Sequence, residues 1–587
     1  MGRRVAMLTF AQQHIARLSC NPAIGGLAKG TLVRELDALG GLMARVADRT
    51  TVQFRQLNTR KGLAVRSSRA QVDIGGYPAE MQRRLACIET LEIIQAEATS
   101  LVLRGGRISG VVLADGRQLE TQAVILTTGT FLAACMHQGD RQTGGGRIGD
   151  RAAHALSASL QECGLRLSRL KTGTPPRLAK DSIDWSALTL QDEHEGRFSF
   201  APTRRTLPSL GCHIAYTTES THELIRQNLQ RSSMFSGAIT GTGPRYCPSI
   251  EDKVHRFGHR NRHQLFLEPE GHDTDRVYVN GFSTSLPAEV QLEALRTIPG
   301  LGQARVLQYG YAVEYDFSDP RDLDESLQHR GIPGLYLAGQ VNGTSGYEEA
   351  AVQGFVAGVS AARGEALVLG RDQAYIGVLV DDLITRGVGG EPYRMFSSRA
   401  EHRLLLREDN ADRRLMPLGH ELGLLPEPEW RAFEARERSI EGATAALRRA
   451  RIRPDASTLQ ELEALDLGGL RKPATGEELL RRPGARYADL AGLMPLPPLC
   501  EQAAEQVETE VRYAGYIRRQ KARAEQARRL EHRSLEGVDF AVVPGLSIEV
   551  RERLMRALPR NLGSASRLPG ITPAAVDTLV VFLARSQ

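Results

Sequence analysis

Residues 334–354 read GLYLAGQVNGTSGYEEAAVQG. An apolar run ends in Ala338-Gly339-Gln340, a glycine-rich loop follows, and a helix with a face of alanine and glycine begins near Tyr347. The N-terminus of such a helix points at whatever lies above the strand tip, and the small side chains let the helix pack closely on a sheet. The stretch predicts an α/β fold with a dinucleotide site of the flavin type.

Three apolar runs of similar character come earlier in the chain: VAMLTF (5–10), VVLADG (111–116) and AVILTTG (123–129). Continuous apolar runs that end near glycine are typical of buried strands in a parallel or mixed sheet, whose C-terminal ends carry ligand loops. Thr128 and Gly129 end the third run, where small residues let a flat cofactor approach the backbone. A plain tight turn explains those two residues equally well. Helical stretches lie between the runs, at 79–89 and 152–164.

Domain organisation follows from where the strand signal stops. Residues 175–285 have irregular polar loops and Pro-rich turns, which indicates an inserted domain. Beyond residue 370 the strand signal nearly vanishes, 501–533 reads as one long helix, and 547–586 as several short helices. The fold expected is a Rossmann-like domain in two parts (1–175 and 286–370), an inserted α+β nucleotide or substrate domain (176–285) and an all-helical domain (371–587).

Composition narrows the class of protein. The 587 residues include 75 basic and 69 acidic side chains, a net charge of +6, which excludes a histone-like polycation. No apolar run approaches the ~18 residues that a membrane span needs, and the start has no signal-peptide cleavage pattern. The seven cysteines are odd in number and show no CxxC spacing, which argues against a zinc site and a disulfide framework. We expect a soluble cytoplasmic protein without a metal site.

The loop SCNPAIGGLAKG (19–30) is a candidate anion site. Gly25, Gly26 and Lys29 precede a helical pattern, so backbone N–H groups, the lysine and a helix N-terminus could face an anion. A plain glycine-rich turn between a strand and a helix is an equally good interpretation.

A second candidate is the cysteine in GTGPRYCPSIEDK (241–253). Arg245 and Lys253 give Cys247 an electropositive setting that would favour the thiolate. For any single cysteine, however, a small buried and inert thiol is the better interpretation.

The stretch 512–533 is strongly basic. It holds eight basic and two acidic residues, so one predicted helix carries a charge of +6 and could contact phosphates. A solvated helix face explains the same composition. The candidate nucleic-acid contacts are Arg512, Arg518, Arg519, Lys521 and Arg523.

Eight segments together resemble one protein family, the MnmG (GidA) family of tRNA-modifying flavoproteins, over essentially the whole chain. These segments are SCNPAIGGLAKG (19–30), KTGTPPR (171–177), GPRYCPSIEDKV (243–254), FLEPEG (266–271), STSLP (283–287), GYAVEYDFSDPRDL (310–323), AGQVNGTSGYEEAAVQG (338–354) and EPYRMFSSRAEHRLLLREDNADRRL (391–415).

The resemblance implies an activity. The family, as a homodimer with its GTPase partner MnmE, adds a carboxymethylaminomethyl or aminomethyl group to C5 of the wobble uridine of certain tRNAs. It uses FAD, NADH, methylenetetrahydrofolate, and glycine or ammonium. A thiolate that adds to C6 of the uracil would activate C5, so the chain is expected to be an enzyme in which Cys247 is the nucleophile.

The resemblance also implies site residues. Cys20 and Cys247 fall on the two functional cysteines of the family, and the long C-terminal helices fall where the family contacts tRNA and its partner. The expected FAD contacts are Gly25, Gly26, Lys29, Ala98, Thr128, Gly129, Ala153, Gly339, Gln340, Gly343 and Gly346. The expected nicotinamide-nucleotide segment runs from Gly243 to Phe257 and includes Pro244, Arg245, Tyr246, Ser249, Glu251, Asp252 and Lys253.

The sequence departs from the family at its beginning. Family members start with an apolar strand, the motif GGGHAG and a helix, and this chain resembles them only from the end of that helix, at Gly2-Arg3-Arg4. No GxGxxG follows an N-terminal strand, and GGGRIG (144–149) is a different loop. The absent unit holds a pyrophosphate and supplies the central strand. Either the reading frame starts about 25–30 residues upstream, enough for a strand, a turn and a helix, or flavin binding is impaired. We expect the first, because the other flavin motifs are intact.

Three other functions compete. A folate- and FAD-dependent methyltransferase of the T-loop uridine in tRNA shares the flavin motifs but lacks a long C-terminal helical domain, so residues 391–587 argue against it. A non-catalytic protein that binds tRNA or a partner would keep the helices and lack flavin. A flavin oxidoreductase acting on a small substrate leaves the basic helix and RMFSSRAEHRLLLRED (394–409) unexplained.

Overall fold

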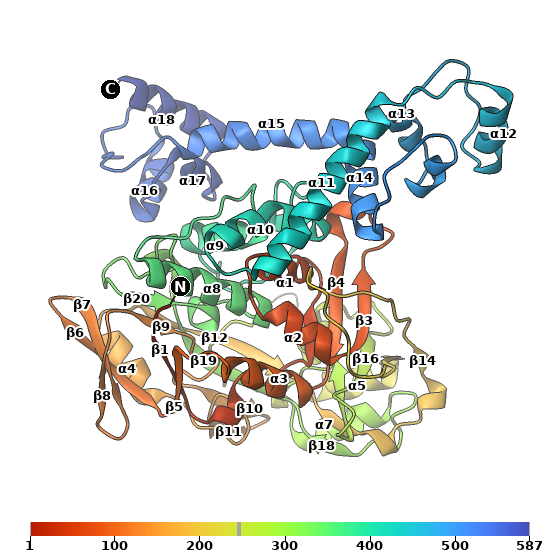
Figure 1. Ribbon diagram of the computed structural model, residues 1–587. Coiled ribbons are helices and arrows are strands. Elements are labelled where there is room, and N and C mark those ends of the chain that lie inside the picture. Colours follow the sequence, from red (N-terminus) through yellow and green to blue (C-terminus); the bar gives the residue numbers. More distant parts are fainter. Residues whose placement is uncertain (1, 244–247, 586–587) are drawn as a thin grey trace.

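The computed structural model describes residues 2–243 and 248–585 (Figure 1). It consists of a mixed α/β body and a helical C-terminal part, as the sequence predicts. No helix within these residues is long and apolar enough to cross a membrane.

Two pairs of parallel strands contain three of the predicted apolar runs, at 5–10, 123–129 and 334–340, together with β5, which was not predicted from the sequence. Strand β1 lies beside β5, with Val5 opposite Leu91, and β20 lies beside β9, with Leu335 opposite Val124. Within the described residues neither pair has a third strand, and Val5 is 53% exposed. The bounds are β1 (Val5–Thr9), β5 (Leu91–Gln95), β9 (Val124–Leu126) and β20 (Leu335–Leu337).

The run at 111–116 lies in a different sheet from the other three. It overlaps β7, the middle strand of an antiparallel sheet with the order β6-β7-β8, in which Val111 and Leu113 are buried. A short apolar run is compatible with either kind of pairing, so the pattern does not distinguish them. The bounds are β6 (Ala98–Arg104), β7 (Arg107–Leu113) and β8 (Gln118–Glu120).

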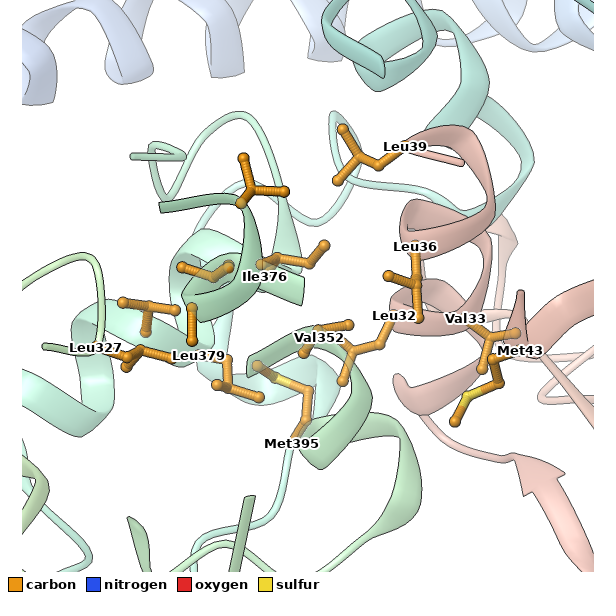
Figure 2. Close-up of a cluster of buried hydrophobic side chains, with 14 of the residues drawn as sticks. Leu32, Val33, Leu36, Leu39, Met43, Leu327, Val352, Ile376, Leu379 and Met395 are labelled. Atoms are coloured by element: carbon orange, nitrogen blue, oxygen red, sulfur yellow. The ribbon is translucent and has the colours of Figure 1, made fainter. Parts of the chain in front are cut away.

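One hydrophobic core joins helices that are far apart in the sequence. Leu32 and Leu36 of α1 and Leu39, which caps its C-terminus, recur at helical spacing and are almost fully buried. Figure 2 shows Leu32 beside Val352 of α8, and Ile376 of α9 belongs to the same cluster. Each such side chain contributes about 1.5–3 kcal/mol when buried, so this core holds α8 in place. The bounds are α1 (Lys29–Ala38), α2 (Met43–Thr50), α8 (Tyr347–Arg363) and α9 (Tyr375–Arg386).

The inserted part is built on a six-stranded sheet with the order β14-β15-β16-β17-β13-β18. Its core continues past residue 285 through Val290 and Leu295 of α7, and the last strand ends at Gln308. The compact unit is therefore longer than the expected 176–285. The bounds are β13 (Arg177–Ala179), β14 (Thr189–Leu190), β15 (His213–Tyr216), β16 (Gln264–Pro269), β17 (Arg276–Asn280), β18 (Val306–Gln308), α5 (Glu219–Gln227), α6 (Ile250–Arg256) and α7 (Ala288–Arg296).

A segment of the inserted part runs back over α1 and α2. The Asp48 carboxylate accepts hydrogen bonds from the backbone N–H groups of Phe198 and Ser199, both at 2.8 Å, and Asp37 accepts one from Phe200 N–H at 2.8 Å. Both carboxylates are buried. These bonds fasten the inserted unit to the first one.

A four-stranded antiparallel sheet, in the order β11-β10-β19-β12, lies where the two units meet. Tyr311, Val313 and Tyr315 of β19 form an apolar cluster with Leu170 of β12. The bounds are β10 (Cys135–Gln138), β11 (Arg141–Gly144), β12 (Leu167–Thr174) and β19 (Tyr311–Ser318).

The helical part divides into segments with separate cores. Helices α9 and α10 pack on the core of the α/β body, whereas α11, α13 and α14 share a second core and α16, α17 and α18 a third. The single helix expected over 501–533 is two helices, interrupted at Tyr513. Figure 1 shows α15 spanning the distance between the second and third groups. The bounds are α10 (Ala411–Glu421), α11 (Glu427–Arg449), α13 (Gly476–Leu480), α14 (Glu501–Arg512), α15 (Ala514–Glu531), α16 (Ile548–Ala557), α17 (Leu562–Arg567) and α18 (Pro573–Arg585).

Candidate functional site

The strand tips of the α/β body open onto a cavity of about 1900 Å³. It is larger than the roughly 300–1,000 Å³ of a typical ligand pocket. Part of this space extends between β1 and β9, because residues of both strands line it. The remaining part of the cavity is lined by the loop at 19–21, β12 and the start of α8. The two parts together could hold an elongated ligand.

Tips that are far apart in the sequence meet at this cavity. Thr128 and Gly129 follow β9, Gln340 follows β20, and Gly346 precedes α8; all four line the cavity. A Cβ atom on Gly129 would lie 3.6 Å from Gln340 Oε1, so the two turns are in contact. The convergence predicted from the sequence is present.

Three polar atoms in the cavity wall are buried and have no hydrogen-bond partner among the residues that the structure describes: Asn21 Oδ1, Thr128 Oγ1 and Ser345 Oγ. Buried polar groups normally have partners, because leaving one unpaired costs about 1–3 kcal/mol. Ligand atoms or ordered water would supply those partners. The wall therefore suits a flat ligand that carries hydrogen-bonding groups along its edge, as an isoalloxazine ring does.

The loop with Gly25, Gly26 and Lys29 is already satisfied by the protein. Gly25 N–H donates to Glu348 Oε1 at 2.6 Å and Gly26 N–H to Ser68 O at 2.8 Å. The Lys29 ammonium lies 2.9 Å from Glu348 Oε2 and 3.0 Å from Glu349 Oε2. Burial lowers the pKa of Lys29, but the two carboxylates more than compensate, so this pKa is raised.

These contacts do not provide the anion cradle expected from the sequence. Protein acceptors already occupy the N–H groups of Gly25 and Gly26 and the Lys29 ammonium. The carboxylates that bind Gly25 and Lys29 belong to α8, more than 300 residues further along the chain. Gly25 and Lys29 do line the cavity. The arrangement fixes the loop against α8.

Cys20 lines the cavity at the other end of the same loop. Its backbone N–H donates to Tyr347 Oη at 2.9 Å, and its Sγ lies 3.7 Å from the carbonyl oxygen of Gly173. Ser19, next to it, accepts from Arg177 at its carbonyl oxygen and from Arg147 at Oγ. Both guanidinium groups also have carboxylate partners, Asp150 for Arg147 and Glu270 for Arg177, so their contacts with Ser19 mainly fix the position of the loop.

Comparison with known proteins identifies the chain. The family model described as "Glucose inhibited division protein A" matches residues 1–366. This chain belongs to the MnmG (GidA) family. Two models for the C-terminal region, described as the "tRNA modifying enzyme MnmG/GidA C-terminal helical domain" and "helical bundle", match residues 427–521 and 523–587.

Individual relatives agree with the assignment to the MnmG family. Proteins of Geobacter sulfurreducens and Geotalea uraniireducens, both named "tRNA uridine 5-carboxymethylaminomethyl modification enzyme MnmG", are 50% and 49% identical to this chain. The alignments cover 99% of this chain in each case, and 94% and 95% of the relatives. A crystal structure of Aquifex aeolicus GidA superposes with a TM-score of 0.89 at 41% identity, covering 98% of this chain and 94% of that one. The family and fold resemblances are confirmed.

The other flavin candidates of this MnmG-family chain separate into two groups. Ala98 and Ala153 line the cavity. Gly339 and Gly343 are not among its lining residues; both have positive φ, +87° and +74°, and Gly339 N–H donates to the Gln353 side chain at 3.1 Å. These two glycines shape the turn between β20 and α8.

The nicotinamide-nucleotide candidates are only partly described, because Pro244, Arg245, Tyr246 and Cys247 lie outside the described residues. Among the others, Glu251 is fully buried and accepts from Ser285 N–H at 2.9 Å and Ser232 Oγ at 3.0 Å. These contacts give Glu251 a structural role. The remaining contacts are Ser249 as the N-cap of α6, Asp252 paired with Arg256, Lys253 donating to Gly281 O, and Gly243 beside Lys171.

The basic candidates lie on α15 and at the end of α14. Arg512 is also exposed, but its guanidinium already donates to Ala485 O and Glu508. Arg518, Arg519, Lys521 and Arg523 are exposed, and Arg519 lies over the ring of Tyr516. Four of the five predicted residues therefore form an accessible basic surface in the MnmG-family helical part.

Sequence reasoning missed three residues that build the site: Asn21, Arg177 and Tyr347. Asn21 and Tyr347 lie in two of the motifs named above, 19–30 and 338–354, but only the glycines, Lys29, Gln340 and Cys20 of those motifs were predicted to be site residues. Arg177 follows two prolines, and nothing local shows that its guanidinium is buried. Its role follows from contacts with distant residues, the hydrogen bond to Ser19, 158 residues away, and the ion pair with Glu270, 93 residues away.

Proposed function

We propose that this chain is an FAD-dependent enzyme that adds a carboxymethylaminomethyl or aminomethyl group to C5 of the wobble uridine in tRNA. NADH, methylenetetrahydrofolate and glycine or ammonium are the co-substrates, and MnmE is the GTPase partner. The observation that carries the proposal is the meeting of Thr128, Gly129, Gln340, Gly346 and Cys20 on one cavity. The relatives named MnmG support the substrate.

The cavity residues fit FAD, and we assign them to its flavin end. Asn21, Thr128 and Ser345 would form hydrogen bonds with the polar edge of the ring. The small residues Gly129, Ala98 and Ala153 leave room for the ring to lie close to the backbone. When bound, FAD supplies a carrier for hydride or a one-carbon unit between folate and the base. The protein orients the reactants and excludes water from the cavity.

The cysteines provide the covalent chemistry in this proposal. C5 of uracil is a poor nucleophile until a thiolate adds to C6, which breaks the C5–C6 double bond and places negative charge on C5 and O4. We assign that role to Cys247 and place Cys20 beside the flavin. The segment from Gly243 to Phe257 is assigned to NADH.

The helical part is assigned to tRNA and the partner protein. The exposed cations Arg518, Arg519, Lys521 and Arg523 on α15 would pair with backbone phosphates, which position an RNA without reading its sequence. We further propose that the chain works as a homodimer in the cytoplasm.

Nucleoside analysis of bulk tRNA tests the proposal. In a strain lacking its own enzyme, expression of this chain should restore the modified wobble uridine. Cys247→Ala should abolish it while bound flavin survives, and Cys500→Ala, at an exposed cysteine that caps α14, should leave it intact. Normal modification with Cys247→Ala would reject the nucleophile assignment. Absence of the modified nucleoside with the unaltered chain would reject the function.

A further inference from the structure

The sheet β11-β10-β19-β12 has a second face whose polar groups have no part in the reaction proposed above. Glu314 of β19 stands directly opposite Cys135 of β10 and Lys171 of β12, and Asp316 stands opposite Arg169. Glu314, Lys171 and Asp316 are each at most 8% exposed. Charged side chains are almost never buried unless they are paired, so their partners explain why they are there.

The partners of Glu314 come mainly from a short stretch of the inserted unit. Glu314 Oε1 accepts hydrogen bonds from Thr240 N–H at 2.9 Å, Thr240 Oγ1 at 2.8 Å and Gly241 N–H at 2.5 Å. Glu314 Oε2 accepts from Arg169 Nη2 at 3.2 Å. Burial raises the pKa of Glu314, but these hydrogen bonds outweigh it, so this pKa is lowered and the group is ionised near neutral pH.

The same stretch lies along the edge of β12. Lys171 N–H donates to Thr242 O at 3.1 Å, and Leu170 and Thr242 form a parallel bridge. A Cβ atom on Gly241 would lie 2.9 Å from the carbonyl carbon of Leu170, so only glycine allows this approach. Residues 240–242 therefore have a fixed position relative to β12.

Strand β12 also contacts the cavity, through Gly173. Its carbonyl oxygen is 3.7 Å from Cys20 Sγ, and Gly173 lines the cavity. Positions 171 and 173 are about 7 Å apart along a strand. The stretch held by Glu314 and the Cys20 loop thus attach to neighbouring positions of one strand.

We propose that Glu314 is a positioning residue: its carboxylate holds Thr240 and Gly241 against β12 and thereby sets where the chain leading to Cys247 begins. This inference rests on the proposed function only in giving Cys247 a chemical role. A misplacement of about 1 Å at a reacting group can slow a reaction about 10²-fold, which is the size of effect expected here.

Glu314→Gln is the informative variant, because an amide cannot accept all of these bonds. If the amide oxygen faces Thr240 and Gly241, the NH₂ group faces the Arg169 guanidinium. In the reverse placement, the NH₂ group faces the N–H groups of Thr240 and Gly241. A donor therefore faces a donor in either placement. Glu314→Asp keeps the charge but shortens the reach, and it should recover part of the function. Asp316→Asn is the matched control, since Asp316 is on the same strand and shares Arg169, yet its bonds go to Ser157 and Arg169.

Two measurements on the full chain test the proposal. Amide hydrogen exchange should accelerate at residues 240–242 in Glu314→Gln and stay as in the unaltered chain in Asp316→Asn. The kcat for tRNA modification should fall about 10²-fold in Glu314→Gln with an unchanged KM for tRNA and retained flavin, whereas Asp316→Asn should stay within about threefold.

The exchange measurement does not depend on activity, so it separates this proposal from the proposed function. Accelerated exchange in a chain that modifies no tRNA would support the contact and reject the function. Unchanged exchange at 240–242, or a kcat within about threefold of the unaltered chain in Glu314→Gln, would overturn the positioning role. If Glu314→Gln does not fold, Glu314→Asp must show the same changes in smaller measure, and its failure to do so would also overturn it.

Discussion

Arg177 Nη2 donates a hydrogen bond of 2.9 Å to the carbonyl oxygen of Ser19, the residue before Cys20. The Arg177 side chain is among the largest that are fully buried, and it also donates to Glu270 Oε1, Thr174 Oγ1 and Pro175 O. One guanidinium thus ties the first loop of the chain to the end of β12. The relationship explains why Cys20 lies at the cavity wall.

Replacing Arg177 by lysine should destabilise the protein strongly. An ammonium cannot reach Ser19, Thr174 and Glu270 at once, and each buried acceptor that loses its donor costs about 1–3 kcal/mol. Urea unfolding measures the change. Arg305→Lys is the control, because Arg305 pairs with Asp181 at the surface, and it should change stability by no more than about 1 kcal/mol. Equal effects of the two substitutions would contradict the account of the buried guanidinium.

The Lys29 cluster makes a prediction in which a second substitution rescues the first. Lys29→Met leaves Glu348 and Glu349 buried without their counter-ion, so we expect a loss of about 3–5 kcal/mol. Adding Glu349→Gln removes one of the two unpaired charges, and the double variant should be more stable than Lys29→Met alone. Chemical denaturation of both variants checks the order. A double variant less stable than the single one would show that the lysine is not there to balance these carboxylates.

The pH dependence of stability should reveal the burial of Asp48, whose carboxylate lies against the segment at 198–199. Burial raises the pKa of Asp48 to about 6, although the N–H groups of Phe198 and Ser199 oppose the shift. The folded state therefore holds a proton that the unfolded chain has lost between about pH 4 and pH 6, so the stabilisation is present below the ordinary pKa and lost as the pH rises through about 6.

Thermal unfolding at a series of pH values measures this effect. Between about pH 4 and pH 7 the unaltered chain should lose more stability than Asp48→Asn, which has no proton to release at this position. Parallel pH profiles for the two proteins would mean that Asp48 has an ordinary pKa.

Substitution of Thr128 should change the affinity for FAD without lowering the stability of the free protein. Its Oγ1 is buried and has no partner within residues 2–243 and 248–585, so Thr128→Val should leave the free protein equally stable or slightly more stable. If the hydroxyl pairs with the flavin, the same change should weaken FAD binding by about 0.5–1.5 kcal/mol, or roughly 2- to 13-fold. Fluorescence titration gives the affinity, with Thr189→Val on exposed β14 as the control. An unchanged affinity would remove Thr128 from the flavin site.

The basic surface of α15 predicts a particular salt dependence. Replacing Arg518, Lys521 or Arg523 with alanine should weaken tRNA binding and lower the slope of log K against log salt by roughly 0.7–0.9 for each phosphate that the variant leaves unpaired. Flavin binding should be unaffected. Arg529→Ala, on the same helix but paired with Glu525, serves as the comparison. If the three exposed cations give the same slope as Arg529→Ala, then α15 is only a solvated helix.

Local sequence patterns predicted the parts of the fold that depend on local residues. The runs at 5–10, 123–129 and 334–340 contain β1, β9 and β20, because a short continuous apolar run is typical of a buried strand. Strands β9 and β20 are parallel neighbours, so their C-terminal ends meet at one edge, where the turns after them line the cavity. These elements needed no knowledge of distant contacts.

Contacts between distant segments account for what the patterns could not provide. The local sequence around Lys29 predicts a phosphate ligand, but in the structure Lys29 pairs with Glu348 and Glu349. The local sequence around Arg177 predicts no role, which its contacts with the distant Ser19 and Glu270 reveal. The interruption at Tyr513 has no glycine or proline at that position to mark it. There α14 remains packed by Val507 and Val511, while α15 continues into solvent.

The central claim is that the turns at Thr128, Gln340 and Gly346, together with the Cys20 loop, form one flavin site. The most direct test is a crystal structure of the protein with FAD bound. The account predicts an isoalloxazine ring against Thr128 and Gly129, with Asn21 Oδ1 or Ser345 Oγ hydrogen-bonded to the cofactor and Cys20 at the edge of the ring. A ring bound outside this cavity, or separated from Cys20 by another part of the chain, would contradict it.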